Sequence, residues 1–116
     1  ERLPWIEARS ECARYGGDLV KIGSLARNMD VQELVLSKSE GDVWVGASDQ
    51  AEEGVWRWTD GSLLDESYTG KSVWQLHNYL NWDNGEPNDD HSNSGHLQDC
   101  AQMRLNGRWD DNNCSA

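Results

Sequence analysis

Two short motifs hold the residues best suited to chemistry in this chain. Glu86-Pro87-Asn88 sets two oxygen-bearing side chains on either side of a proline, and Trp109-Asp110-Asp111 follows later in the sequence. Oxygen ligands in irregular backbone suit a hard cation such as calcium. Side chains that hold such an ion can also hydrogen-bond a ligand resting on it, so this region is a candidate sugar site.

Acidic residues gather at four places. These are Asp49 with Glu53, residues 86–90, Asp99, and Asp110-Asp111. Each cluster alone resembles an ordinary turn, because Asp and Asn are common turn residues. Together they are more informative, since each stands at the edge of an expected strand or long loop. The chain has no EF-hand sequence, so any calcium site must be of another kind.

The composition indicates a single acidic domain over residues 1–116. It contains seven tryptophans and no phenylalanine, so tryptophan supplies much of the large apolar area. The expected core tryptophans are Trp5, Trp44, Trp56 and Trp109. The net charge of −11 excludes nucleic acid as a partner, because phosphate binding needs Lys and Arg. A solvated acidic surface is the simpler interpretation of this charge, and cation binding is the sharper one.

Several function classes lack a sequence signal. No run of apolar residues is long enough for a membrane span. No signal peptide is visible, so we expect a mature or trimmed product. The sequence shows no Ser/His/Asp or Cys/His constellation and no paired-acid pattern for hydrolysis, so an enzyme is not expected.

The cysteines allow one short disulfide. Cys100 and Cys114 flank a polar segment with a turn at Asn106-Gly107, and a bond between them would close a loop of about 15 residues and contribute roughly 3 kcal/mol. Cys12 is then left over, which indicates a partner outside the chain, an intermolecular bridge or a free thiol. Three reduced, buried cysteines in a cytosolic protein are the alternative.

The residue spacing predicts two helices followed by short strands and long loops. Apolar residues recur at helical spacing from Pro4 to Tyr15, and Ser24 is placed to cap a second helix. The inner face of that second helix is expected to carry Leu25, Met29, Leu34 and Val35. Extended segments are expected at 18–22, 43–47 and 55–58, and a hairpin at 101–109. Residues 62–97 have the composition of one long loop, which bound ions could order.

The order of these motifs resembles the C-type lectin-like domains, from Trp5 to Cys114. The elements that carry the resemblance are Trp5-Ile6-Glu7-Ala8 with Cys12; Gly16-Gly17-Asp18-Leu19-Val20 with Ile22 and Ser24; Val43-Trp44-Val45-Gly46 followed by Asp49, Glu53-Gly54, Trp56 and Trp58; Asn81-Trp82 ahead of Gly85-Glu86-Pro87-Asn88; and Asp99-Cys100 with Gly107-x-Trp109-Asp110-Asp111-x-x-Cys114. The resemblance implies a non-enzymatic, secreted or extracellular domain. Its fold would be α+β, with two helices, small antiparallel sheets and a long calcium-binding loop.

The same resemblance implies two calcium sites. The sugar-binding ion would be held by Glu86, Asn88, Gln98, Asp110 and Asp111. A second ion would be held by Asp49, Glu53, Asp89, Asp99 and the carbonyl of Gln98. The peptide bond before Pro87 is expected to be cis, which would aim Glu86 and Asn88 at one ion. Two vicinal sugar hydroxyls would supply the last ligands of the sugar-site calcium.

Two residues depart from the family's usual pattern. Gln98 stands where sugar-binding members usually have Glu, and Asp110 stands where they usually have Asn. The ligand charge is unchanged, but the hydrogen-bond polarity of this pair is reversed, because a carboxylate only accepts whereas an amide can donate. The Glu86/Asn88 order is the mannose- and fucose-type order, whereas the reversed Gln98/Asp110 pair suits galactose in a turned pose. Both sugar classes stay open at this point.

The chain also lacks the family's first and last strands and its final cysteine, which pairs with the position of Cys12 in relatives. A fragment is therefore expected. Single-site sugar affinity should be weak, near about 1 mM, and homo-oligomers or tandem domains would raise binding to glycans or glycoproteins. One competing hypothesis is a structural or biomineral-matrix protein whose acidic surface binds calcium. Another is a protein-binding domain with vestigial calcium sites.

Overall fold

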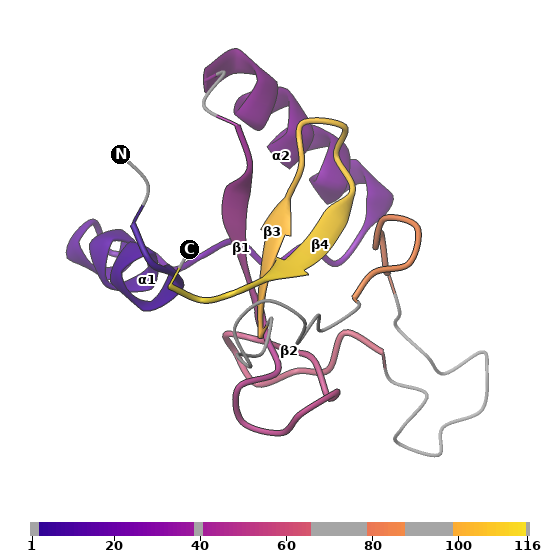
Figure 1. The fold of residues 1–116 in the computed structure, drawn as a ribbon. Coiled ribbons are helices and arrows are strands. Elements are labelled where there is room, and N and C mark those ends of the chain that lie inside the picture. The colour runs from indigo at the N-terminus through magenta and orange to yellow at the C-terminus, as the bar shows by residue number, and fades with distance from the viewer. Residues whose placement is uncertain (1–2, 39–40, 66–78, 88–98, 116) are drawn as a thin grey trace.

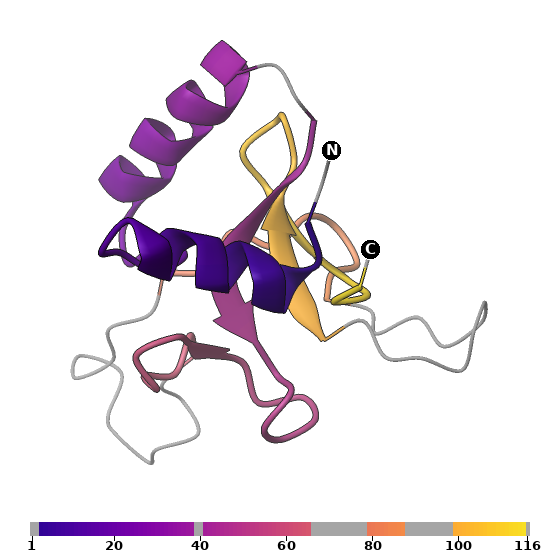
Figure 2. The ribbon, with the colours of Figure 1, turned by 90° about the vertical axis from the view of Figure 1, so that its left-hand side faces the viewer.

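The computed structural model describes residues 3–38, 41–65, 79–87 and 99–115, and it shows two helices with a four-stranded antiparallel sheet (Figure 1). In chain order the elements are α1 (Trp5–Arg14), α2 (Leu25–Lys38), β1 (Val43–Ser48), β2 (Arg57–Trp58), β3 (Cys100–Met103) and β4 (Trp109–Asn112). The strand order in the sheet is β2-β1-β3-β4. Figure 2 shows α1 crossing in front of β1, with α2 to the upper left of the sheet. The predicted α+β class is therefore confirmed.

The hairpin of β3 and β4 forms as the sequence predicts. Gly107 takes a φ of 84°, which an L side chain rarely adopts, and its N–H donates to the Arg104 carbonyl at 2.8 Å. The register pairs Met103 with Trp109 and Gln102 with Asp110. This turn therefore decides which residues of β3 lie opposite the acidic pair of β4.

The tryptophans predicted as core are buried. Their exposed fractions are 3% for Trp5, 8% for Trp44, 9% for Trp56 and 0% for Trp109. Trp109 makes edge-on ring contacts with Trp58, Tyr79 and Trp82, at centroid distances of 5.7 to 5.8 Å. Offset and edge-on arrangements of this kind are the favourable ones for aromatic pairs. The aromatic cluster thus joins the strands to the 79–87 segment.

The inner face predicted for α2 is wrong at three of its four positions. Leu25, Met29 and Leu34 are 61%, 58% and 58% exposed, and only Val35 is buried. The face that packs inward carries Asn28 and Val35, with Val31 partly buried against the core. Asn28 takes part in this face because its side chain hydrogen-bonds to the β3–β4 hairpin. The spacing of apolar residues in the sequence cannot reveal such a contact.

The segment from residues 18 to 22 is an extended link and not a strand. It runs close to β1, where the Gly46 N–H donates to the Val20 carbonyl at 2.8 Å. A Cβ on Gly46 would lie 2.7 Å from the Leu19 carbonyl oxygen, so only glycine allows this approach. The strand expected at 55–58 is likewise shorter, and covers only Arg57–Trp58.

The disulfide between Cys100 and Cys114 is present, as predicted. Cys12 takes part in no disulfide among the residues described, and its side chain is partly buried. The Trp5 N–H donates to the Cys114 carbonyl at 2.7 Å, so the two ends of the described chain lie side by side (Figure 1). Within the described ranges, neither helix is long and apolar enough to cross a membrane.

Asn28 provides a test of this architecture. Its Oδ1 accepts a hydrogen bond from the Trp109 indole N–H at 2.8 Å, and its Nδ2 donates to the Gly107 carbonyl at 3.0 Å. Asn28→Ala should lower the free energy of unfolding by about 1–3 kcal/mol, because it leaves buried polar groups unsatisfied. Denaturant unfolding measures this, with Asp30→Ala on the exposed side of the same helix as the control. Equal stabilities of the two variants would contradict the assigned role.

Candidate cation-binding site

Backbone hydrogen bonds bring the two sequence motifs together. The Trp109 N–H donates to the Asn81 carbonyl at 2.8 Å, and the Asp83 N–H donates to the Trp109 carbonyl at 2.7 Å. A turn follows, in which the Glu86 N–H donates to the Asp83 carbonyl at 2.9 Å. The segment that carries Glu86 is thus fastened beside the start of β4, directly next to Asp110.

Glu86 lies in an acidic and partly dry environment. The peptide bond between Glu86 and Pro87 is cis, as predicted. Burial is the largest cause that raises the pKa of the Glu86 carboxyl, to about 7, and a hydrogen bond with Asp111 and the charges of Asp111 and Asp110 add to it. The three carboxyl groups therefore share one small region. A proton and a metal cation would compete for the same oxygens there.

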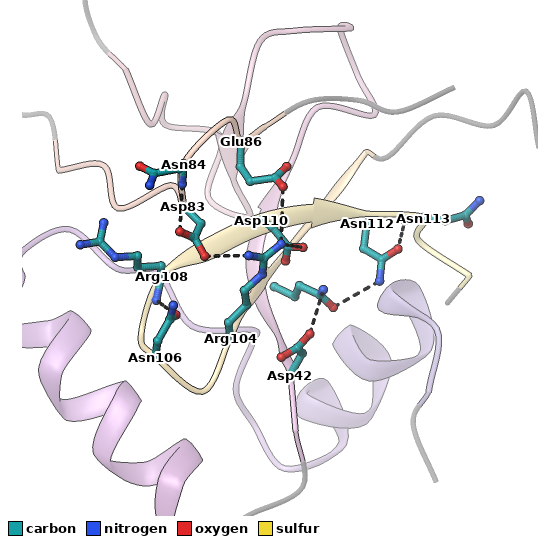
Figure 3. Close-up of polar contacts among 11 residues, drawn as sticks. Asp42, Asp83, Asn84, Glu86, Arg104, Asn106, Arg108, Asp110, Asn112 and Asn113 are labelled. Atoms are coloured by element: carbon teal, nitrogen blue, oxygen red, sulfur yellow. Dashed lines mark hydrogen bonds and ion pairs between the residues drawn. The ribbon is translucent and has the colours of Figure 1, made fainter. Parts of the chain in front are cut away.

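Arg104 lies among these carboxylates (Figure 3). Its Nη1 lies 2.7 Å from an Asp83 oxygen, and its Nη2 lies 2.9 Å from Asp110 Oδ2 and 3.4 Å from Glu86 Oε2. Sequence reasoning missed this residue. The Asn106-Gly107 turn implies the register of the β3–β4 hairpin. That register places Arg104 diagonally across from Asp110, so cross-strand pairing could have predicted their contact.

A second acidic group lies at the start of β3. Ligand oxygens of Asp49, Glu53 and Asp99 all lie within 4.8 Å of one another. The backbone holds the group together, because the Asp49 N–H donates to the Asp99 carbonyl at 3.0 Å. Asp49 Oδ2 also accepts from the Gly54 N–H at 2.8 Å, which orients the carboxylate.

The donor chemistry of both groups fits a calcium ion. Asp49 is 2% exposed, and its Oδ1 is buried with no hydrogen-bond partner in the described part of the chain. Asp110 Oδ1 is likewise buried, with no hydrogen-bond partner among the residues that the structure describes. Buried carboxylate oxygens are costly without a donor or a cation, and calcium prefers several carboxylate and carbonyl oxygens. The residues present are thus suited to that ion.

The predicted ligand sets are brought together as far as the structure describes them. Glu86, Asp110 and Asp111 of the first set converge, whereas Asn88 and Gln98 lie outside the described residues. Asp49, Glu53 and Asp99 of the second set converge, and Asp89 lies outside. Tyr79, which falls within the predicted loop of residues 62–97, packs against Trp109.

A cavity of about 390 Å³ connects the two acidic groups. Its lining includes Asp49, Glu53 and Asp111, together with Trp56, Trp82 and Pro87. The lining therefore combines carboxylates from both groups with two tryptophan side chains. A ligand that carries several hydroxyl groups presents both polar and apolar surface, which suits this lining. This part of the molecule is therefore the candidate functional site.

The fold and these motifs define a known family. The profile of the lectin C-type domain matches residues 1–116, so the chain belongs to the C-type lectin domain family. Among curated relatives, the hepatic lectin of Gallus gallus is 31% identical over 115 residues, which cover 98% of this chain and 46% of that protein. The chain thus spans about half the length of that relative.

Solved structures agree in fold. The C-type lectin CEL-I from Cucumaria echinata matches with a TM-score of 0.74 and 30% identity, over 97% of this chain and 76% of its own. A calcium-independent type II antifreeze protein matches with a TM-score of 0.71 and 31% identity, over 98% of this chain and 72% of its own.

Asp49 tests whether the second acidic group takes up a cation. Asp49→Asn keeps the shape and an acceptor for the Gly54 N–H but removes one negative charge, so it should weaken calcium binding there by about tenfold or more. Calorimetric calcium titration measures the affinity, and Glu52→Gln, a neighbouring exposed acid outside the group, is the matched control. Equal titrations for the two variants would exclude this group as a calcium site.

Proposed function

We propose that this domain binds carbohydrate through a loop-bound calcium ion, with two vicinal sugar hydroxyls completing the ligands of the ion. Membership of the C-type lectin domain family supports carbohydrate binding in general. The observation that carries the calcium-dependent form is the convergence of Glu86, Asp110 and Asp111 beside the cis Glu86-Pro87 bond. Calcium, when bound, would supply a hard Lewis-acid centre for the hydroxyl oxygens.

The side chains of the site divide the hydrogen bonding to the sugar. The proposed ligands of the sugar-site calcium are Glu86, Asn88, Gln98, Asp110 and Asp111. Each carboxylate can accept a hydrogen bond from a sugar hydroxyl, and each amide N–H can donate a hydrogen bond to a hydroxyl oxygen. The order of acids and amides around the ion therefore decides which pair of hydroxyls fits and in which direction.

This order supports two sugar classes. Glu86 and Asn88 have the mannose- and fucose-type order, which is our first candidate. Asp110 favours the galactose class as the second candidate, since its carboxylate accepts where an amide usually donates. The guanidinium of Arg104 donates to Asp110 Oδ2 at 2.9 Å, which leaves the other carboxylate oxygen, Oδ1, to act as an acceptor.

A second calcium held by Asp49, Glu53, Asp89 and Asp99 would have a structural role. It would order the segments on both sides of the cavity and thereby position the sugar site. We further propose a secreted or extracellular setting, which suits the Cys100–Cys114 disulfide. Weak single sites of this kind gain strength through several copies, so multivalent glycans or glycoproteins are the expected partners.

The competing function is a structural or mineral-associated role for the acidic surface. The same fold occurs in a calcium-independent type II antifreeze protein, so the fold is not restricted to calcium-dependent sugar binding. A diffuse acidic surface would bind calcium through many carboxylates at once. The sugar-binding proposal instead depends on one small set of residues, and this difference makes the two functions separable by mutation.

Asp111 separates these two functions. Its side chain is 2% exposed and lies against Glu86, so Asp111→Asn should abolish calcium-dependent binding to a glycan surface while barely changing the total surface charge. Surface plasmon resonance on an immobilised glycoprotein, with and without chelator, measures this. Asp30→Asn, which removes one exposed acid of α2, is the control. Equal losses in both variants would favour the diffuse acidic surface.

Monosaccharide competition decides the sugar class. If the Glu86/Asn88 order dominates, mannose and fucose should displace the bound glycan at about millimolar concentrations, and galactose should need at least tenfold more. If the Asp110 polarity dominates, that ranking reverses. Inhibition by none of the three sugars, in a protein that still binds calcium, would count against the lectin function itself.

A further inference from the structure

We propose that Arg104 is a tethered counter-ion of the sugar-site carboxylates. It holds Asp110 and Glu86 together when calcium is absent, and it opposes the ion when calcium arrives, so that it sets the calcium affinity of the domain. This inference rests on the proposed function, because it assigns Glu86 and Asp110 to the calcium site. Arg104 is a positioning residue in this scheme and is not itself a ligand of the ion.

The contacts of Arg104 place a full positive charge inside the acidic group. Nη2 reaches Asp110 Oδ2 at 2.9 Å and Glu86 Oε2 at 3.4 Å, while Nη1 reaches Asp83 at 2.7 Å (Figure 3). The planar guanidinium can serve several carboxylates because its donors point in fixed, separate directions. Glu86 and Asp110 come from segments far apart in the sequence, and this one side chain bridges them.

Asp83 gives the arrangement its anchor. It is not a proposed calcium ligand, yet it forms the shortest of the three ion pairs with Arg104. Its other oxygen accepts the Asn84 N–H at 2.9 Å, and this bond and Arg104 both lower the pKa of the Asp83 carboxyl. The guanidinium is therefore also held by a carboxylate that is not a proposed ligand of the ion.

The backbone of Arg104 is equally fixed. Its N–H donates to the Arg108 carbonyl at 2.8 Å, and its carbonyl accepts from the Gly107 N–H at 2.8 Å. Both bonds belong to the tight end of the β3–β4 hairpin, next to the turn. The Arg104 side chain therefore extends toward the carboxylates from a backbone position that the hairpin hydrogen bonds fix.

The contact with Asp110 also selects an oxygen. Oδ2 accepts from the guanidinium, whereas Oδ1 is buried and has no hydrogen-bond partner in the ranges that the structure describes. The arrangement thus leaves Oδ1 for the cation and keeps Oδ2 on Arg104. The pair of Asp110 and Arg104 carries no net charge, so the guanidinium offsets one carboxylate of the acidic group.

The electrostatic consequence has a definite sign in each state. Without calcium, Arg104 lowers the repulsion among Glu86, Asp110 and Asp111, so its loss should destabilise the domain. With calcium, the same charge repels a divalent ion bound to the same carboxylates, so its loss should tighten calcium binding. The Arg104 side chain is 37% exposed, and solvent and salt therefore reduce this effect to about tenfold in affinity.

The test compares Arg104→Gln with Arg108→Gln. Both variants remove one arginine charge from the same hairpin, but the Arg108 side chain points away from the acidic group (Figure 3). We expect Arg104→Gln to lower the melting temperature in chelator by several degrees and to tighten the calorimetric calcium affinity by about tenfold. Arg108→Gln should leave both quantities near those of the wild type.

Arg104→Lys provides a second variant if the first fails to fold. It keeps the charge but lacks the planar fork, so it should keep the wild-type calcium affinity while losing stability in chelator. A calcium affinity of Arg104→Gln equal to or weaker than that of Arg108→Gln overturns the inference. Absence of calcium binding in both the wild type and Arg108→Gln would instead refute the proposed function. This outcome differs from failure of the Arg104 inference, because it occurs in proteins that keep Arg104.

Discussion

Trp109 is the residue on which the rest of the site depends. Its side chain is fully buried, donates to Asn28 of α2 and packs edge-on against three aromatic rings. Its backbone bonds on both sides to the segment that carries Glu86. Asp110 and Asp111 follow it directly, so the core that fixes this one indole also fixes the two carboxylates. Three consecutive residues therefore combine the buried anchor with two carboxylates of the candidate site.

The opposing constraint is repulsion between like charges. The domain brings Glu86, Asp110 and Asp111 into one partly buried place, where burial first, and then the neighbouring Asp111 and Asp110, raise the pKa of the Glu86 carboxyl. A fold can maintain such a group only with counter-charges, protons or a cation. Here the hairpin supplies one counter-charge through Arg104, whose guanidinium contacts both Glu86 and Asp110. A divalent cation is suited to supply further positive charge to a group of this kind.

The sequence predicted the fold class, the central strand, the hairpin and the disulfide, and the described members of both predicted ligand sets lie near one another. These features follow from local signals: apolar runs, the Asn106-Gly107 turn, cysteine spacing and motifs in family order. The inner face of α2 was predicted wrongly because periodicity counts only apolar residues, whereas Asn28 is buried for its hydrogen bonds. Arg104 was missed for a related reason. Its role comes from cross-strand register and from three carboxylates that are distant in the sequence.

The meeting of the chain ends has a further consequence for how the domain can be mounted. The Trp5 N–H bonds to the Cys114 carbonyl beside α1, and Figure 1 shows the 79–87 segment on the other side of β4. A tether or a solid support joined at either end would therefore leave the side that carries the candidate site pointing outward. Many copies could be arrayed by one short stalk each without blocking one another, a geometry in which weak contacts add up on a crowded surface.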